Sequence, residues 1–382
     1  MVAPLIYVVA GEQSGDVLGA RLIAALRAAR PELDFAGIGG PRMAEQGVES
    51  LFPINELAVM GLLEVLPRLW WLRRLLHAAA ADIRARRPAV LVTIDSPGFT
   101  LRLLRLAGGG VKRVQYVAPQ VWAWRERRVR HFPGLWDRLL CLLPFEPAFF
   151  ARHGLAASFV GHPVLESGAD TGDAARFRAA HGIAPGAPVL VLMPGSRRSE
   201  VGRLLPVLGR TLALLAARVP GLVAVVPVAS AVAATVRAQT AAWPVRPVVV
   251  TELADKHDAF AAAGAALTKS GTSTLELALA GVPMVVTYRV NPLTAAIARR
   301  LIKVPYAAMV NLLAGREVVP ELLQQDSTPE KLAEAMLRLL ADPQAAARQR
   351  AALREVIASL APPRGLPSEA AAAEVLALLG TP

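Results

Sequence analysis

Short apolar runs alternate with helix-forming stretches along this chain, and the alternation begins twice. In the first part, strands are expected at residues 5–10, 34–38, 89–94, 113–117 and 138–143, and helices at 16–29, 39–47 and near 100–107. In the second part, strands are expected at 189–193, 223–228, 247–250, 265–268 and 284–288, and helices at 204–218 and 231–241. Such alternation predicts an α/β fold in which parallel sheets carry helices on both faces.

The length of 382 residues exceeds one ordinary domain, and a 54% hydrophobic content can fill two cores. A Gly- and Pro-rich interval at 161–188 separates the two series. We therefore predict two doubly wound, Rossmann-like domains, at 1–165 and 166–355, that face a cleft. Residues 356–382 are expected to form a linker and a final helix that packs back on the first domain.

Composition excludes several classes of protein. The single cysteine, Cys141, rules out an internal disulfide framework and a cysteine-rich metal site, which fits a reducing cytoplasm. The first residues lack the basic region of a signal peptide, and no apolar run is long enough to span a bilayer.

The net charge of +12 is concentrated in one region, because residues 66–130 contain 14 Lys and Arg against three acidic residues. Such a surface suits nucleic acid, anionic lipid or an acidic substrate, although arginines at solvated positions without a function would give the same count.

The segment 269–279 predicts a nucleotide site. A short apolar strand precedes it, and Ser270 or Thr272 can cap the helix that follows. Free N–H groups at such a helix start stabilise phosphate oxygens. Glu276 shares a helix face with Thr272 and can accept hydrogen bonds from a diol such as a ribose. An ordinary capped helix with a surface glutamate would have the same sequence.

In open parallel sheets ligands bind beyond the carboxyl ends of the strands, so the loops at 10–16, 37–43, 95–99 and 193–199 are the places to look for chemistry. None is a Walker P-loop or a convincing dinucleotide fingerprint. No Asp-x-Asp pair is present either, so we expect neither a metal nor a cofactor, and helix dipoles and arginine would have to stabilise a diphosphate.

Six motifs in register carry a family resemblance: AGEQSGD at 10–16, YVAPQVWAW at 116–124, LPFE at 143–146, GHP at 161–163, PGSR at 194–197 and SGTSTLE at 270–276. With Tyr288-Arg289 and the segment 311–317, they make almost the whole chain resemble the lipid-A-disaccharide synthases. The resemblance implies a GT-B glycosyltransferase of the inverting type. Its substrates would be UDP-2,3-diacylglucosamine and 2,3-diacylglucosamine 1-phosphate (lipid X), and its products the β-1,6-linked disaccharide 1-phosphate and UDP.

The resemblance also implies a donor site in the second domain. The turns that contain Ser196, Arg197, Ser270, Gly271 and Thr272 would face the diphosphate, with Arg197 neutralising charge as UDP leaves. Glu276 would take the ribose hydroxyls. Three further residues match family positions near the nucleotide without a defined contact: Tyr288, Arg289 and Asn311.

An inverting displacement needs a base for the acceptor 6-hydroxyl, and Asp95 is the first candidate. It ends an apolar strand and matches the family's aspartate, although it could instead cap the turn at Ser96. Glu12 is the second candidate. Two residues on the same loop as Glu12 are candidate acceptor contacts, Ser14 and Asp16, and Asp16 could instead cap its own helix.

Acylated substrates would explain the segment 57–76, which has the composition of an interfacial segment. The residues expected at the acceptor or the membrane are Met60, Trp70, Trp71, Arg73 and Arg74. Each basic residue near an anionic leaflet contributes roughly 1 kcal/mol, so the protein is expected at the cytoplasmic face of the inner membrane. A buried pair of core helices is the alternative. Trp122 and Arg125 would continue this surface or grip the acceptor phosphate.

Two other functions remain open from the residues alone. Another GT-B transferase or an epimerase that uses UDP-N-acetylglucosamine would share the second-domain turns but would not need the segment 57–76. A nucleic-acid-binding protein would use the basic region, but no nucleic-acid motif is present and the interleaved apolar residues favour lipid. A homodimer is compatible with the sequence, which does not set the oligomeric state.

Overall fold

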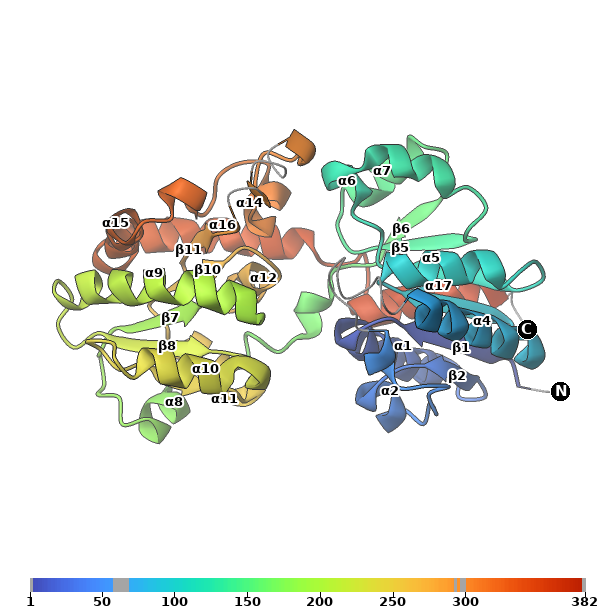
Figure 1. Cartoon of the computed structure of the whole chain (residues 1–382), viewed down its shortest axis with the longest axis horizontal. Coiled ribbons are helices and arrows are strands. Elements are labelled where there is room, and N and C mark those ends of the chain that lie inside the picture. The colour runs from blue at the N-terminus through green and yellow to red at the C-terminus, as the bar shows by residue number, and fades with distance from the viewer. Residues whose placement is uncertain (1–2, 58–68, 292–293, 296–299, 380–382) are drawn as a thin grey trace. The chain divides into compact units, whose positions relative to one another are not determined.

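The computed structural model describes residues 3–57, 69–291, 294–295 and 300–379. The chain divides into two compact units, Met1–Pro163 with Leu360–Pro382 (unit 1) and Val164–Ser359 (unit 2). The sequence had placed the boundaries at 165/166 and 355/356. Figure 1 shows that each unit contains a sheet with helices packed against it.

Unit 1 contains a six-stranded parallel sheet in the order β2-β1-β3-β4-β5-β6. Its strands are β1 (Leu5–Ala10), β2 (Asp34–Ile38), β3 (Val90–Ile94), β4 (Lys112–Tyr116), β5 (Arg138–Cys141) and β6 (Ala157–Phe159). The helices are α1 (Gln13–Ala29), α2 (Pro41–Glu45), α4 (Leu69–Arg86), α5 (Pro97–Leu106), α6 (Val121–Trp124), α7 (Glu146–Ala151) and α17 (Pro367–Leu379), with 3-10 helices η1 (Ile54–Glu56) and η3 (Glu126–His131).

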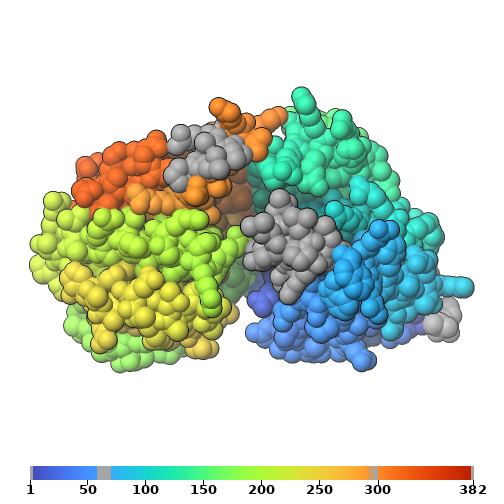
Figure 2. All heavy atoms as spheres, viewed as in Figure 1, coloured from blue at the N-terminus to red at the C-terminus, as the bar shows by residue number. Residues whose placement is uncertain are grey.

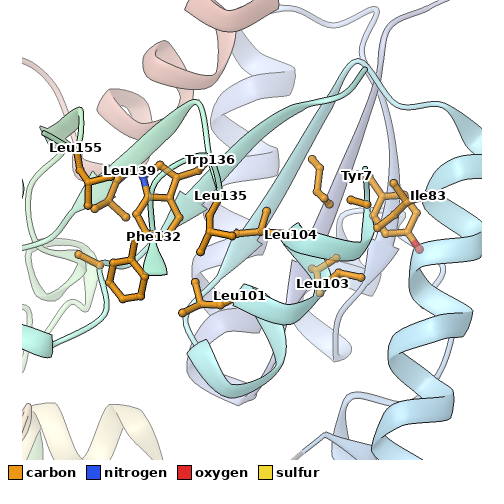
Figure 3. Packing of buried hydrophobic residues seen from close by; sticks show 14 of the residues in the cluster. Tyr7, Ile83, Leu101, Leu103, Leu104, Phe132, Leu135, Trp136, Leu139 and Leu155 are labelled. Atoms are coloured by element: carbon orange, nitrogen blue, oxygen red, sulfur yellow. The ribbon is translucent and has the colours of Figure 1, made fainter. Parts of the chain in front are cut away.

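Strand β1 shows why helices cover both faces of this sheet, because its side chains alternate between two cores. Tyr7 and Val9 belong to a cluster with residues of α4 and α5, part of which is drawn in Figure 3. Ile6 and Val8 belong to a second cluster with the buried face of α1. Val375 of the C-terminal α17 completes that second cluster, so the last helix of the chain belongs to the core of unit 1.

Unit 2 repeats the architecture with the strand order β12-β11-β10-β7-β8-β9, again all parallel. Its strands are β7 (Val189–Met193), β8 (Val223–Pro227), β9 (Val248–Val250), β10 (Ala265–Lys269), β11 (Met284–Tyr288) and β12 (Glu321–Leu323). The helices are α8 (Ala174–Ala180), α9 (Arg198–Ala216), α10 (Ser230–Thr240), α11 (Leu253–Ala262), α12 (Ser273–Leu279), α14 (Met309–Ala314), α15 (Pro329–Ala341) and α16 (Pro343–Ser359), with 3-10 helices η4 (Pro163–Glu166) and η5 (Gln324–Asp326).

Helices α9 and α15 cover one face of the second sheet. Leu208 and Leu212 of α9 and Met336 of α15 are buried in a cluster with Leu190 and Leu192 of β7. In Figure 2 the yellow-green surface of α9 continues into the yellow surface of α10 and α11 on the visible side of this unit.

The two parallel sheets confirm the predicted α/β class. The largest error in an expected element concerns α9, which begins at Arg198, six residues before the predicted start at 204. The backbone N–H groups before the helix have a partner that the sequence did not suggest, because the Glu200 carboxylate turns back to accept them. Strands β6 and β12 and helices α11, α15 and α16 had not been predicted.

Candidate active site

In unit 2 the strands β7 and β10 are neighbours, and the order of the sheet runs in opposite directions from them. This is a topological switch point, where loops that leave adjacent strands separate and open a crevice. The loop after β7 contains Ser196 and Arg197, and the loop after β10 contains Ser270, Gly271 and Thr272.

A pocket of about 410 Å³ lies at this switch point. Polar groups from both loops and from α12 line it, among them Ser196, Thr272 and Glu276. Apolar residues that follow β8 and β9 also line it, including Val228 and Leu253, and Leu253 is 59% exposed. A pocket with an apolar wall and a few convergent polar groups is the usual form of a small-molecule site.

Glu200 organises the loop after β7. Its side chain is 6% exposed, and its carboxylate accepts hydrogen bonds from the backbone N–H groups of Ser196 at 3.2 Å and Arg197 at 3.4 Å. The ammonium group of Lys269, at the end of β10, lies 3.3 Å from the other oxygen. Gly195 has a φ of 110°, and a β-carbon there would meet the Glu200 carboxylate. Glycine therefore allows this glutamate to join the two loops.

Glu276 is paired with a lysine that the sequence analysis did not select. The Nζ atom of Lys256, on α11, lies 2.8 Å from both carboxylate oxygens of Glu276. The two side chains are 21% and 23% exposed, and both line the pocket. The pair fixes the direction of the carboxylate, and the two opposite charges balance each other at this part of the pocket lining.

The predicted caps of α12 are wrong. Thr272 occupies the N-cap position but makes no side-chain capping bond, and it has helical φ and ψ angles. The Ser270 hydroxyl donates to the carbonyl of Ala307 at 2.6 Å, which ties the loop after β10 to the segment before α14. Gly271 has a φ of 150°, at the edge of the region that favours glycine.

Tyr288 ends β11 and is half-buried, and it lies close enough to Glu200 for their side chains to share a hydrogen bond. Burial, together with this carboxylate, raises the pKa of Tyr288, and the nearby charge of Arg197 opposes the change. The Arg197 side chain is exposed, and Arg289 is half-buried. None of the three is among the residues that line the pocket.

Asn311, which was expected near the nucleotide without a defined contact, is used within the framework of unit 2. Its side chain is fully buried and makes four hydrogen bonds within unit 2. The amide nitrogen donates to the Val319 carbonyl and to Glu321, and the amide oxygen accepts from the N–H groups of Val318 and Val319. This asparagine holds the turn after α14, and its polar atoms are already used there.

Unit 1 has its own switch point between β1 and β3, where the loop after β1 carries Glu12 and the loop after β3 carries Asp95. The Glu12 side chain lies close enough to Asp95 to lower the pKa of that carboxyl group. Gly11 makes this approach feasible, since a β-carbon at that position would overlap the side chain of Ser96.

Asp95 has an unusual backbone and an unusual environment. It has a φ of 50° and Ser96 a φ of 42°, so two consecutive non-glycine residues adopt the left-handed region. Burial raises the pKa of Asp95, and hydrogen bonds from the Ser96 backbone and the Glu12 side chain lower it in part. A raised pKa brings this carboxyl group closer to the range useful for proton transfer near neutral pH.

Asp16 belongs to the framework of unit 1. Its side chain is 3% exposed, and its two oxygens accept hydrogen bonds from the N–H groups of Gly40, Arg42 and Met43 at 2.7 to 3.0 Å. It therefore caps α2 and does not cap its own helix, as had been considered, and its oxygens are not available for an acceptor contact. Ser14 is exposed near the start of α1.

Of the predicted interfacial segment 57–76, the described part at 69–76 divides between surface and core, and Met60 lies outside the described residues. Trp70 is 67% exposed, and Arg73 and Arg74 are exposed beside it on α4, which forms part of the visible blue surface in Figure 2. Trp71 is half-buried and donates to Glu56 at 2.8 Å. The end of the segment belongs to the core instead, since Leu75 and Leu76 are buried.

The tryptophan motif after β4 is anchored by a buried acid. Trp122 Nε1 donates to Glu146 at 3.0 Å, and Glu146 also accepts the N–H groups of Leu142 and Leu143. Burial raises the pKa of Glu146 to about 7. Trp122 is thus held by the structure, whereas Arg125 is exposed and stacks on Trp124, with its guanidinium carbon 3.9 Å from the ring centroid.

His162 precedes the boundary between the units. It is buried, and its backbone N–H donates to the Leu360 carbonyl at 3.0 Å, which joins the chain leaving unit 1 to the chain that returns to it. Burial lowers the pKa of His162 to about 4, so the ring is neutral near pH 7.

A protein family described as lipid-A-disaccharide synthetase matches residues 6–375. The chain belongs to this family. A lipid-A-disaccharide synthase from Granulibacter bethesdensis is 63% identical to it over 392 aligned residues, which cover 100% of both chains.

Solved structures show the same two-domain GT-B fold at low sequence identity. The glycosyltransferase of kitacinnamycin is 19% identical, with a TM-score of 0.65 over 98% of this chain and 99% of the other. A UDP-N-acetylglucosamine 2-epimerase from Neisseria meningitidis, solved with UDP-N-acetylglucosamine, is 13% identical, with a TM-score of 0.65 over 99% and 100% of the two chains. At this identity the likeness establishes the fold alone.

Among the described helices of this family member, none combines the length and apolar character needed to cross a membrane. The described residues also contain no group of three or more His, Cys, Asp or Glu side chains arranged to hold a metal ion.

Proposed function

We propose that the chain transfers 2,3-diacylglucosamine from UDP to the 6-hydroxyl of 2,3-diacylglucosamine 1-phosphate with inversion, which gives the β-1,6-linked disaccharide 1-phosphate and UDP. Membership of the lipid-A-disaccharide synthetase family supports the reaction. The neighbouring carboxyl groups of Glu12 and Asp95 at the switch point of unit 1 are the observation that carries the mechanism, because they supply a half-buried base beside a second acid.

The pocket of unit 2 would hold the nucleotide of the donor. The uracil would lie against the apolar wall that includes Val228 and Leu253, and the ribose hydroxyls would donate to Glu276. Lys269 and the exposed Arg197, at the start of α9, supply positive charge for the diphosphate as the bond to the sugar breaks. Lys256 would keep Glu276 aimed at the diol.

Asp95 would act as the general base. The oxygen of the acceptor 6-hydroxyl attacks the anomeric carbon from the face opposite UDP, and the bond from that carbon to the phosphate oxygen breaks with its electrons on UDP. The hydroxyl proton passes to the Asp95 carboxylate. Glu12 would support this role, because its side chain favours the ionised form of Asp95.

The acylated substrates would be met at an anionic membrane surface, at the cytoplasmic face of the inner membrane. The exposed Trp70 with Arg73 and Arg74 supports this peripheral attachment, since an aromatic side chain beside guanidinium groups suits the region of lipid headgroups.

Turnover assays with defined sugars test this function. We expect UDP release only when donor and acceptor are both acylated, and comparable release from UDP-N-acetylglucosamine would reject the lipid assignment. Asp95→Asn should lower turnover by about 10²-fold or more while UDP binding is retained. Near-normal turnover of that variant would move the role of base to Glu12.

A further inference from the structure

A second pocket in unit 1, which we call the cationic pocket, has a volume of about 310 Å³ and no assigned ligand. Arg102 and Arg105 of α5 line it together with Arg128 and His131 of η3. Within the part of the chain that the structure describes, no Asp or Glu is among its lining residues. Three guanidinium groups around one hollow create a positive potential that attracts anions.

The two arginines of α5 are oriented by carbonyl groups, and no described carboxylate is paired with them. Arg102 Nη1 donates to the Gly98 carbonyl at 2.9 Å, and Arg105 Nη2 donates to the His131 carbonyl at 3.1 Å. Each guanidinium has five N–H donors, so most of them are not used by these bonds. No ion pair among the described residues joins Arg102, Arg105 or Arg128 to a carboxylate.

The floor of the cationic pocket belongs to the rigid core of unit 1. Leu101 and Phe132, which line it, are buried in the cluster shown in Figure 3. Phe132 packs on Trp136 with ring centroids 5.3 Å apart. The two elements that carry the cations are therefore fixed to one another, and the site does not depend on a loose loop.

On one side the cationic pocket continues into an apolar pocket of about 750 Å³ between α4 and α5. The two share Pro97, Gly98 and both arginines of α5. The large apolar side chains that line this pocket are those of Leu57, Leu72, Leu76, Phe99 and Leu106, and its polar lining includes Arg73, His77 and Ser96. A ligand that spans this boundary must have an anionic group and a hydrocarbon part.

On the other side the cationic pocket adjoins a pocket of about 330 Å³ that contains Asp95. Leu101, Arg128 and Phe132 line both, and Pro97 lines all three pockets. The proposed base, the cluster of cations and the apolar pocket therefore follow one another around the start of α5.

We propose that the cationic pocket binds the phosphate monoester of the acceptor, with Arg102 and Arg105 as its principal ligands. The acceptor hydroxyl then reaches Asp95 while an acyl chain enters the apolar pocket. This inference rests on the proposed function, and it replaces Arg125 with the α5 arginines as the main phosphate contacts. A guanidinium group matches phosphate because its N–H fork can donate two parallel hydrogen bonds.

The test compares two short-chain acceptors, with and without the 1-phosphate, dispersed in non-ionic detergent. The variant is the double substitution Arg102→Ala/Arg105→Ala. The control is Arg127→Ala, which removes an exposed arginine of η3 that lines none of the three pockets. We expect the double variant to raise KM for the phosphorylated acceptor about 10- to 100-fold, as charge-assisted hydrogen bonds of this kind would require. UDP binding and the control should not change.

The acceptor without phosphate supplies the decisive comparison, because the wild-type protein and the double variant should use it within about twofold of one another. An equal loss with both acceptors would overturn the proposal in favour of a structural role. Loss of flotation with anionic vesicles, with KM for the dispersed acceptor unchanged, would assign the arginines to lipid headgroups instead.

If the wild-type protein turned over neither acceptor, the proposed reaction would fail. Equilibrium binding of the phosphorylated acceptor to both proteins, without donor, would then decide the pocket separately.

Discussion

Gly11→Ala is expected to impair catalysis more than folding. The added β-carbon would overlap Cβ and Oγ of Ser96, on the loop after β3. Rotation of the serine side chain cannot remove the clash, because Cβ is fixed to a backbone with a φ of 42°. The loops after β1 and β3 must therefore separate, and they carry the neighbouring side chains of Glu12 and Asp95.

Inserting a methyl group into a packed site costs about 1–3 kcal/mol. For a unit of this size each kcal/mol corresponds to about 2–4 °C in Tm, so we expect Tm to fall by about 2–12 °C. A displacement of the base of about 1 Å can lower the rate about 10²-fold, so the loss in kcat should be of that order. UDP binding should not change, because the nucleotide pocket lies entirely in unit 2.

The assay measures kcat and KM for the acylated acceptor, UDP affinity by calorimetry, and Tm. Gly109→Ala is the matched control, since a β-carbon there meets no atom within 4 Å. The reasoning would be refuted by a Gly11→Ala protein whose kcat stays within about twofold of the control. A protein that loses UDP affinity in parallel with kcat would instead indicate damage that extends beyond the two loops.

Four further predictions concern charged groups. Asp95→Asn should leave Tm unchanged or raise it at about pH 8. The pKa of Asp95 is raised in the folded protein, so its ionisation lowers the free energy of unfolding as pH rises through that pKa. A fall in Tm would contradict this. The acidic limb of kcat/KM, attributed to the same group, should lie above the ordinary Asp value near 3.8, and a limb at or below it would count against Asp95 as the base. Glu276→Gln should weaken UDP binding about tenfold or more in calorimetry through loss of a charged acceptor, and unchanged affinity would move the ribose elsewhere. In the wild-type protein the contribution of Glu146 to the free energy of unfolding should decline from about pH 4.5 to 7, because burial raises its pKa. Glu146→Gln should therefore flatten the dependence of Tm on pH in that window. An unchanged slope would argue against the raised pKa of Glu146.

The fold class followed from local signals because each buried parallel strand is an apolar run of its own. Strands β1 and β7 have the predicted bounds, 5–10 and 189–193. The start of α9 did not follow, since the N–H groups just before the helix are satisfied by Glu200 from within it and the residue before the helix is an arginine, which is not a usual cap. Strand β12 has only three residues and pairs at the sheet edge, so it left little pattern to detect.

In the nucleotide pocket, the sequence selected groups from the loops after β7 and β10 and from α12, and it missed the lysine that α11 contributes. Ser196 and Thr272 line one pocket because the strands before them are neighbours. Lys256 comes from α11, where a lysine in a helix has no local signal that distinguishes it from a surface residue. Its pairing with Glu276 depends on how α11 and α12 pack, which only the folded chain defines.

Two polar residues in conspicuous motifs proved to be framework residues. Asp16 caps α2, whose N–H groups come from residues 24 to 27 positions later in the chain. Asn311 holds the turn after α14 with four hydrogen bonds. The sequence does not distinguish a motif residue that binds a ligand from one that satisfies buried backbone groups. The hydrogen-bond partners in the folded chain distinguish these two roles.

The place of α17 in the core of unit 1 has a consequence for the chain during its synthesis. Leu22 and Leu26 of α1 leave the ribosome early, but Ala372 and Val375, which share their cluster, emerge only after all of unit 2. At about 5–20 residues per second, the 196 intervening residues of Val164–Ser359 take roughly 10–40 s to make. Throughout that interval the part of the apolar cluster that α17 covers in the finished protein lacks its own cover, although the unit is made first.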